Sequence, residues 1–560
     1  MREDAARVNH WTHPPDRSLQ IFEDLPHYSR AGVMPWRKRP DETLERLATG
    51  DQGGSAEALK NAVCISRRLY QTKLGERFRD EIRTASIATL RDHAPSSSAH
   101  VTLADNQKRI LLYVMTLIVL AMVIAPGATF TLFNVLMIVY FAGVVGFRLY
   151  LAALSHTSPP APTEEPETQD RALPVITILL PLYDEAASLS LLSRSIDELD
   201  YPRDRLDVKL LLEADDDATI SEADRLGLER VFDVITLPPS APRTKPKACN
   251  HGLQLARGDL IVIYDAEDMP ERDQLRKAAA AFAADQESRS GGAPLACAQA
   301  RLNFYNAREN WLTRMFALEY ALWFDSLLPA LERIGAPIPL GGTSNFFRTD
   351  ILRELGGWDP YNVTEDADLG MRLAMRGYRT RMIASTTYEE ANSRLDNWLR
   401  QRSRWMKGYL QTWFVLMRRP RAPARVGGWA GLASTHLFLF GTVAAALLQP
   451  VMWAAFLLGA MTIDAGTQEP RGALEAANLF ALIAGNLAVV ALAASAPFKR
   501  GWRDLAPFAV FAPLYWQLAS LAAFKGAAQL ITRPHYWEKT DHHLSETAAK
   551  ARAQTLDPAA

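Results

Sequence analysis

The sequence predicts an α/β domain, with a mixed, mostly parallel sheet between helices, inserted between α-helical transmembrane segments. Two observations lead to this prediction. Residues 174–408 alternate short apolar runs with amphipathic segments, a texture typical of buried parallel strands joined by helices. Long apolar runs lie on both sides of that region, at 110–147 and 429–531, and such runs are typical of helices that cross a bilayer.

The composition excludes several classes of protein. The chain has 560 residues, enough for more than one folding unit, and its formal net charge is -1 with 22% charged residues. A nearly neutral chain has no overall basic field, so nucleic acid is not an expected partner. Cys64, Cys249 and Cys297 are far apart and lack CxxC spacing, which argues against a disulfide framework and against a zinc site.

Residues 1–107 are polar, and we interpret them as an N-terminal cytoplasmic segment of undefined role. No apolar stretch of the kind found in signal peptides occurs there. One amphipathic pattern, at 57–90, predicts a helix with Arg and Lys on its polar face. A scaffold, a helix on the membrane surface and a regulatory module all fit this pattern.

Two apolar runs, 110–125 and 129–147, predict a transmembrane hairpin over residues 108–152. The Pro-Gly pair between the runs suits a tight connection between two helices. Residues 153–173 are rich in Pro, Thr and Glu and cannot build a core, so they are interpreted as a linker to the α/β domain at 174–408.

The C-terminal part is expected to return to the membrane. We expect an interfacial helix at 409–426, about four transmembrane helices within 427–532, and a cytoplasmic tail at 533–560. A single crossing at 429–463 would place the basic loops on one side, but the last apolar run would then form a hairpin or end outside.

Charge in the loops predicts the orientation. Basic clusters at 418–425 and 499–503 contrast with an acidic loop at 464–470. By the positive-inside rule, the α/β domain is expected to be cytoplasmic and the chain is expected to be a multi-pass membrane protein.

Acidic side chains follow three of the predicted strands at the point where each ends. They belong to the stretches "LYDE" at 182–185, "EADDD" at 213–217 and "YDAED" at 264–268. Because the carboxyl ends of parallel strands meet at one edge of a sheet, this negative charge is costly without a cation or a donor-rich ligand. The pattern predicts a nucleotide site with Mg²⁺ or Mn²⁺, although acids at a loop start can also simply cap the next helix.

Two further features fit such a site. Tyr183 can stack on a base, and Lys245 and Lys247 can offset phosphate charge. Glu365 and Asp366 follow Thr364 at a predicted helix start, where acids are ordinary; a buried acid beside a sugar donor would also serve as general base.

The stretch "QRSRWMKG", residues 401–408, lies just before the apolar C-terminal part. Gln401 can hydrogen-bond sugar hydroxyls, Arg404 can neutralise a diphosphate and Trp405 can stack on a sugar face. The simpler interpretation is an aromatic and basic belt at the membrane interface. Lys407 is expected to be no more than an anchor of this kind.

Taken together, seven segments of the chain resemble the family 2 inverting glycosyltransferases, specifically the membrane-integrated, processive type similar to cellulose, hyaluronan and other β-glycan synthases. In order, over about residues 175–416, they are "LLPLYDE", "EADDD", "KPKACNHGL", "YDAED", "GGTSNFFR", "TED" and "QRSRW". The resemblance implies a GT-A fold, a nucleotide-sugar donor, usually UDP-linked, and a divalent cation, Mg²⁺ or Mn²⁺. It also implies transfer to a growing β-linked polysaccharide that the membrane helices guide outward.

The resemblance also implies roles for single residues. Asp366 is the expected catalytic base, and Asp265 and Glu267 are the expected cation ligands. Asp184 stands where the family commonly has Asn. Since the family's DxD motif reads Asp-Ala-Glu-Asp here, either Glu267 or Asp268 can complete the coordination. The residues expected to bind the donor are Tyr183, Glu185, Asp215, Lys245 and Asp265, and those expected at the acceptor and leaving group are Gln401, Arg404, Trp405 and Glu365.

Two rival functions remain open at this point. One is a glycosyltransferase that modifies a lipid carrier such as polyprenyl phosphate; the "QRSRW" segment favours the polymer, because carrier-lipid enzymes of the same superfamily generally lack it. The other is a transport or sensor protein that binds nucleotide without turnover. The expected partners are a nucleotide-sugar donor, a glycan acceptor, the lipid bilayer and proteins for export or regulation.

Overall fold

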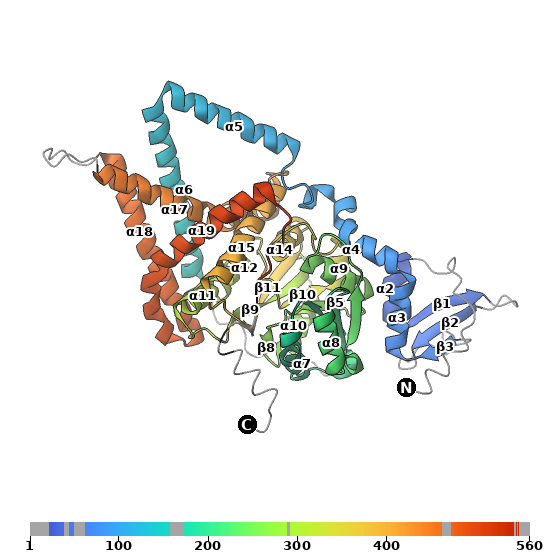
Figure 1. The fold of residues 1–560 in the computed structure, drawn as a ribbon. Helices are drawn as coiled ribbons and strands as arrows, with labels where there is room; N and C mark the ends of the chain where they lie inside the picture. Colours follow the sequence, from blue (N-terminus) through green and yellow to red (C-terminus); the bar gives the residue numbers. More distant parts are fainter. Residues whose placement is uncertain are drawn as a thin grey trace.

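The computed structural model describes residues 22–38, 44–49, 62–156, 173–287, 292–461, 472–541, 545 and 547. It contains a small N-terminal unit, a central α/β domain and a group of long apolar helices (Figure 1). The linker expected at 153–173 lies mostly outside the described residues, as does the end of the tail expected at 533–560.

An eight-stranded mixed sheet forms the centre of the α/β domain, with the strand order β6-β5-β4-β7-β10-β9-β11-β8. In that order the strands are Asp233–Leu237, Leu206–Glu213, Ile176–Leu182, Leu260–Ile263, Asn345–Arg348, Leu295–Phe304, Arg379–Glu389 and Met269–Pro270. β6, β5, β4 and β7 are parallel, as are β9 and β11, whereas β10 and β8 pair antiparallel with their neighbours. The predicted mixed, mostly parallel sheet is confirmed.

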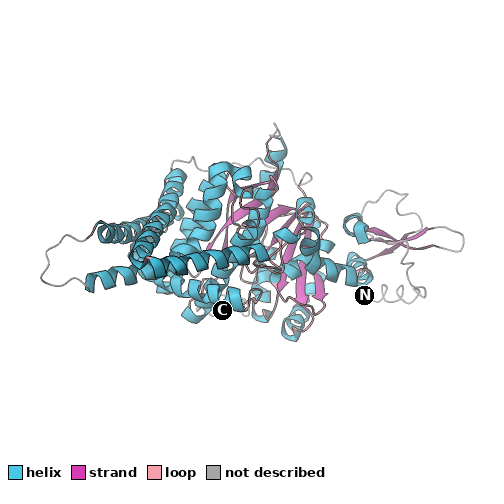
Figure 2. Ribbon diagram, turned by 90° about the horizontal axis from the view of Figure 1, so that it is seen from above, coloured by secondary structure: helices cyan, strands magenta, loops and turns pink. Residues whose placement is uncertain are grey.

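Two apolar cores cover the two faces of this sheet, because successive side chains of a strand point to opposite faces. In β4, Ile178 and Leu180 lie in one core and Leu179 lies in the other. Helices surround the sheet (Figure 2). They are α7 Leu189–Asp197, α8 Asp217–Arg225, α9 Lys245–Leu255, α10 Gln274–Glu287, α11 Trp311–Leu322, α12 Leu328–Arg333, α13 Thr349–Glu354 and α14 Glu365–Met375.

The N-terminal unit contains a sheet that the sequence analysis did not predict. Its strands are β1 Val33–Lys38, β2 Leu44–Thr49 and β3 Ala62–Ile65, and its helices are α2 Leu25–Ala31, α3 Arg67–Arg77 and α4 Arg79–His93. The prediction of a single helix at 57–90 is wrong for the residues that the structure describes, because the fully buried Phe78 separates α3 from α4. α4 rests on the α/β domain, where Asn250 Nδ2 donates to the Ser86 carbonyl at 3.0 Å.

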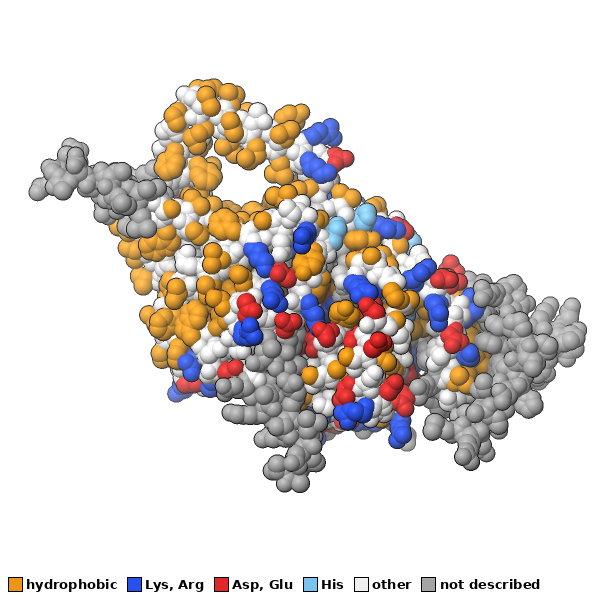
Figure 3. Space-filling model, viewed as in Figure 1, with side chains coloured by type: hydrophobic (Ala, Val, Ile, Leu, Met, Phe, Trp, Pro, Cys, Tyr) orange, Lys and Arg blue, Asp and Glu red, His pale blue; other side chains and the backbone are white. Residues whose placement is uncertain are grey.

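Five described helical stretches are long and apolar enough to cross a membrane: 105–124, 126–156, 422–454, 476–500 and 503–532. The first two are α5 Asp105–Ile124 and α6 Pro126–His156, joined at Ala125 as the hairpin prediction requires. Hydrophobic side chains gather over these helices, whereas charged ones spread over the α/β domain (Figure 3).

The C-terminal part has three such stretches among the described residues, where the sequence predicts about four crossings. The run expected as a helix pair is instead one helical stretch. It consists of α16 Ala422–Ala433, a π-helical turn and α17 Phe440–Met461, with Pro450 inside. Proline is tolerated inside membrane helices, because neighbouring groups satisfy the carbonyl that it leaves unpaired. α18 Ala473–Ser495 and α19 Ala512–Thr532 follow.

The helix α15, Leu395–Leu416, joins the α/β domain to the membrane helices. It runs without a break through residue 408, where the sequence places a domain boundary. At Gly408 it crosses the start of α14 so closely that a Cβ atom would lie 2.3 Å from Thr364 Oγ1. A side chain at this position would force the helices apart, so Gly408 sets how "QRSRW" lies over "TED".

Candidate active site

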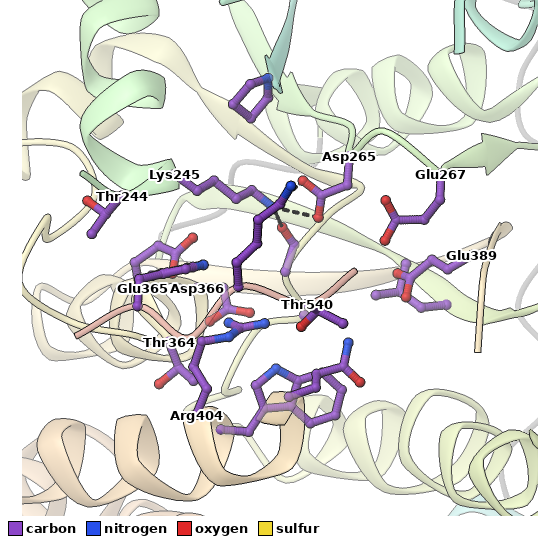
Figure 4. A pocket seen from close by; sticks show the side chains of 18 of the residues that line it. Thr244, Lys245, Asp265, Glu267, Thr364, Glu365, Asp366, Glu389, Arg404 and Thr540 are labelled. Carbon is purple, nitrogen blue, oxygen red and sulfur yellow. Dashed lines mark hydrogen bonds and ion pairs between the residues drawn. The ribbon is translucent and has the colours of Figure 1, made fainter. Parts of the chain in front are cut away.

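A cavity of about 410 Å³ lies at the carboxyl ends of the strands, between the sheet and α15. It gathers residues that are widely separated in the sequence, and Figure 4 shows several of them. All but one of the residues predicted for catalysis, donor, acceptor and cation line it: Tyr183, Glu185, Lys245, Asp265, Glu267, Glu365, Asp366, Gln401, Arg404 and Trp405. Lys247, the second lysine expected to offset phosphate charge, does not line it and is buried.

Asp215 is the exception, because its carboxylate lies outside the cavity lining and is exposed. It pairs with Arg243 at 2.6 Å, and Arg243 in turn lies 3.5 Å from the Tyr183 hydroxyl. The acid of this strand end that lines the cavity is Glu213, which Lys247 holds at 2.7 Å. Asp215 therefore positions an arginine at the rim.

Tyr183 and Asp184 follow β4 at the outer end of the cavity. Asp184 adopts the left-handed conformation, with φ of 55°, which Asn and Asp tolerate better than most residues. Its N–H donates to the carboxylate of Asp216, which also caps α8. This turn points the half-exposed Tyr183 ring toward the cavity rim, consistent with a stacking role.

Asp265, directly after β7, is held by Lys245 at the start of α9. Lys245 Nζ lies 2.5 Å from Asp265 Oδ1 and 2.7 Å from Oδ2, and it also donates to the Gly342 carbonyl at 2.8 Å. Burial by itself would lower the pKa of Lys245, but the charges of Asp265 and Glu365 raise it above its usual value. Lys245 therefore stays protonated and puts a fixed positive charge where a donor's phosphates would bind.

Of the two acids that follow Asp265, Glu267 lines the cavity and Asp268 does not. Asp268 is 1% exposed, and its carboxyl group accepts from the Asp265 N–H at 2.7 Å and from the Thr343 hydroxyl. Burial, followed by the charges of Asp265 and Glu267, raises the pKa of Asp268 well above its usual range. Asp268 therefore shapes the turn, whereas Glu267 is placed to meet a ligand.

The cavity has an excess of acids beside Asp265 that fits a divalent cation. Burial and the charges of Asp268, Glu267 and Asp265 raise the pKa of Glu389, at the end of β11, well above normal. Carboxylates are the ligands that Mg²⁺ and Mn²⁺ prefer, with further oxygens coming from substrate phosphates. Within the described part of the chain no group of three or more His, Cys, Asp and Glu side chains is arranged as a complete metal site, so donor oxygens would have to complete the set.

Asp366 and Glu365, at the start of α14, form a second acidic pair facing the cavity. Burial raises the pKa of Asp366, while the Ala367 N–H, Lys245 and Arg404 act to lower it. Burial and the charge of Asp366 raise the pKa of Glu365 to about 8. The charge of Asp366 is itself one cause of the Glu365 shift, so the two carboxyl groups titrate as a coupled pair.

Space in front of Asp366 is kept by a glycine. A Cβ atom on Gly342 would lie 3.3 Å from Asp366 Oδ2. Thr364, at the start of the same helix, makes no capping hydrogen bond with its side chain, so ordinary capping does not account for this threonine.

The three motif residues of α15 occupy different parts of the cavity wall. Gln401 Oε1 accepts from Asn392 at 2.9 Å. The Arg404 guanidinium lies beside the acids: burial lowers its pKa, and Glu365, Asp366 and Asp265 raise it. Trp405 is stacked on Tyr320, with ring centroids 6.2 Å apart. Arg404 and Lys245 are thus two cations whose charges act on both Asp265 and Glu365.

Lys407 is not an interface anchor, contrary to the sequence-based expectation. It is fully buried, and its Nζ donates to the Tyr536 carbonyl at 2.7 Å. Gln411 likewise donates to the Pro534 carbonyl at 2.9 Å. α15 therefore binds the backbone of the segment that follows α19.

This C-terminal segment, residues 533–541, runs along α15 and forms one wall of the cavity. Trp537, Lys539 and Thr540 line it. The Trp537 ring lies 4.6 Å from the Arg404 guanidinium, and Lys539 Nζ donates to the Asp184 carbonyl at 3.1 Å. Sequence reasoning missed these residues; the only signal is the aromatic and basic run "HYWEK" directly after the last apolar stretch.

Comparisons with known proteins found several similar glycosyltransferases. Residues 260–466 match the family model described as "Glycosyl transferase family group 2". The probable glycosyltransferase YdaM of Bacillus subtilis is 28% identical over 259 residues, which are 44% of this chain and 60% of that protein. Residues 260–466 of this chain are therefore similar to family 2 glycosyltransferases.

Other similar proteins carry more specific names. A β-monoglucosyldiacylglycerol synthase of Trichormus variabilis is 27% identical over 44% of this chain and 52% of its own length. Glucomannan 4-β-mannosyltransferase 1 of Oryza sativa is 27% identical over 39% of this chain and 42% of its own length. The chain thus spans between 42% and 60% of the length of these relatives. A solved mannosyltransferase from Pyrobaculum calidifontis, in complex with GDP-Man and Mn²⁺, is 20% identical, with a TM-score of 0.46 over 71% of this chain and 98% of that one.

Proposed function

We propose that the chain is a membrane-bound inverting glycosyltransferase, which transfers a sugar from a nucleotide-sugar donor, UDP-linked, to an acceptor hydroxyl. The observation that carries this proposal is that Asp265 and Asp366 line one cavity with Arg404 beside both. One carboxylate suits the diphosphate end of a donor, the other suits a general base, and a cation between them suits the leaving group.

The proposed reaction is a single displacement. Asp366 takes the proton of the acceptor hydroxyl while its oxygen attacks the anomeric carbon, and the bond from that carbon to the diphosphate oxygen breaks. Arg404 and Lys245 balance the charge that collects on the departing nucleoside diphosphate. Attack from the side opposite the leaving group inverts the anomeric configuration, which gives a β linkage from an α-linked donor.

Asp265 and Glu267 would hold a divalent cation, Mg²⁺ or Mn²⁺, which when bound adds positive charge beside the leaving diphosphate. The excess of acids around Asp265, described above, supports this assignment. Lys245 keeps the Asp265 side chain in place through both carboxylate oxygens.

For the acceptor, the first candidate is a growing β-linked polysaccharide that the helices export. The "QRSRW" segment of α15 and the name of the glucomannan mannosyltransferase relative support it. A lipid acceptor is the second candidate, and a particular observation favours it: the cavity lining extends to Thr442 of α17, inside a stretch apolar enough to span a membrane. The diacylglycerol relative also fits this second candidate.

We place the chain in a bacterial inner membrane, with the α/β domain in the cytoplasm and both termini of the helical part on that side. Asp504, at the start of stretch 503–532, pairs with Arg308 of the α/β domain at 2.8 Å. Just after its end, the Arg533 carbonyl accepts from Lys407 at 3.4 Å. Because both ends of this stretch contact that domain, we propose that it does not make a single crossing of the bilayer. Two hairpins, 105–156 and 422–500, then account for the crossings and fit the positive-inside rule.

A donor screen with the purified membrane protein tests the function. We expect a nucleotide sugar to release nucleoside diphosphate and to label a product, and Asp366→Asn to remove both signals. Equal release by the variant would overturn the role of Asp366, and binding of donor with no turnover by either protein would favour a nucleotide sensor. Product size separates a polymer from a single sugar on an extractable lipid.

A further inference from the structure

α6 buries a guanidinium, that of Arg148, within the membrane-spanning helices. Arg148 is 6% exposed, and its Nη2 donates to Thr442 Oγ1 of α17 at 2.8 Å. Its guanidinium also lies 5.2 Å from the Trp516 ring of α19. Charged side chains in such segments are costly, and they commonly mark a substrate path or a ligand site.

Arg148 has no anionic partner among the residues that the structure describes. None of the ion pairs between them includes it, and its Nε atom is buried without a hydrogen-bond partner. Glu319, an acid lining the same end of the cavity, already has partners. Both of its carboxylate oxygens accept hydrogen bonds from Arg402, and one also accepts from the Tyr515 hydroxyl. Arg148 is therefore a second cation behind the inner end of the cavity, where the carboxylate of Glu319 is already paired with Arg402.

The buried guanidinium is connected to the catalytic cavity through two residues that line it. Thr442 lines the cavity and holds Arg148 directly. Tyr409 of α15 also lines it, and burial raises the pKa of Tyr409, with the charge of Asp366 raising it further and the charge of Arg148 lowering it. Asp366, Tyr409 and Thr442 line the cavity, and Arg148 lies behind Thr442, to which its Nη2 donates.

We infer that Arg148 binds the phosphate of a phospholipid acceptor whose headgroup hydroxyl reaches Asp366. The inference rests on the proposed transferase activity and selects the second of its two acceptor classes. An unpaired guanidinium favours an anion over the neutral hydroxyls of a glycan, and its planar fork of donors suits phosphate oxygens. The acceptor's order of parts, apolar tails, phosphate and then hydroxyl, matches the order of membrane helices, Arg148 and Asp366.

In the transfer step, the phosphate at Arg148 does not change. The O–H bond of the headgroup hydroxyl breaks and its proton goes to Asp366. The oxygen forms a bond to the anomeric carbon, and the bond from that carbon to the diphosphate oxygen breaks, its electron pair leaving with the nucleoside diphosphate. The product is a glycosylated phospholipid.

The test uses the full chain in detergent with labelled donor and three defined lipids. Phosphatidylglycerol has both phosphate and hydroxyl, diacylglycerol has only the hydroxyl, and phosphatidylcholine has only the phosphate. We expect label on phosphatidylglycerol alone or in large preference. Label on diacylglycerol at an equal rate, or on an added oligosaccharide instead, would overturn the inference while leaving the glycosyltransferase proposal intact. No turnover of any donor would contradict the proposed function itself.

Variants then locate the effect. Arg148→Gln is expected to raise the KM for phosphatidylglycerol about tenfold or more, since hydrogen bonds to charged groups are the strong ones, and to leave the KM for donor unchanged. Arg148→Lys, which keeps the charge but loses the fork, should recover part of this loss.

Gln449→Leu is the matched control. Like Arg148, Gln449 of α17 is a buried polar residue of the membrane helices, but its side chain donates to Asn486 of α18 and does not line the cavity. It is expected to lower thermal stability without changing the lipid KM. If Arg148→Gln behaves like this control, or if Lys does no better than Gln while both fold, Arg148 only ties α6 to α17 and α19.

Discussion

The donor end and the acceptor end of the cavity are built in different ways. The proposed donor end uses acids at the ends of β4, β5, β7 and β11, so strands of a single sheet place them. The acceptor end joins α15 to α17 and to the segment after α19, which are far apart in the sequence. The comparison teaches that the sheet places the acids proposed to face the donor, whereas the proposed acceptor side depends on how the membrane helices pack around it.

The largest expected effect is a loss of kcat on substitution of Asp366, which lies between the donor end and the acceptor end of the cavity. Asp366→Asn should lower kcat by about 10³-fold, because a positioned general base contributes on that order. Donor binding, measured by isothermal titration with the nucleoside diphosphate, should stay close to that of the unchanged protein. A variant that loses donor binding as well would show that Asp366 belongs to the donor end.

A change at the donor end should act on the donor alone. Asp265→Asn is expected to lower kcat/KM for the donor by about 100-fold, since it removes a carboxylate that faces the diphosphate and the cation. Chelation of divalent cations should have a similar effect on the unchanged protein, reversed by Mg²⁺ or Mn²⁺. The KM for the acceptor should move little; a tenfold change in it would break the separation of the two ends.

The C-terminal segment should couple the two ends. Trp537→Ala removes the ring that lies 4.6 Å from Arg404, and a desolvated cation–π contact is worth about 2 kcal/mol or somewhat less, so we expect kcat to fall by about tenfold. Trp502→Ala is a control, because Trp502 faces Arg308 outside the cavity. An unchanged rate for Trp537→Ala would mean that the segment is only a wall.

The smallest expected effect is in the pH profile. Glu365 has a pKa raised to about 8, so it is protonated below that pH and gains a negative charge above it. This charge would oppose the departing diphosphate, and we expect the rate to decline by a few fold as pH rises above about 8. In Glu365→Gln this alkaline decline should vanish, while the acid side, where Asp366 becomes protonated, should remain. Persistence of the alkaline decline would assign it to another group.

The donor end could be predicted from the sequence because its signals are local. An apolar strand that ends in acids shows where a carboxylate emerges, and this placed Asp265 and Glu267 at the cavity. It did not separate Asp215 from Glu213, because β5 ends at Glu213 and Asp215 lies in the turn that follows, where the alternation of a strand no longer fixes the direction of a side chain.

The acceptor end was less predictable, because its residues are brought together by contacts between distant parts of the chain and not by local patterns. Lys407 looks like an interface anchor in sequence, since nothing nearby shows that Tyr536 will supply a carbonyl to a buried ammonium group. Gly408 has no visible role until α15 is seen crossing Thr364. Contacts between elements more than a hundred residues apart leave no periodic pattern, so the wall formed by Trp537, Lys539 and Thr540 could not be foreseen.

The position of residues 533–541 also matters for how the protein is made. The wall that they form is the last part of the cavity to leave the ribosome, after all the apolar stretches have been synthesised. An unfinished chain at the membrane thus has the strand-end acids but lacks Trp537 and Lys539. Its cavity lacks the wall that contacts Asp184 and Arg404 until the segment after α19 has been made.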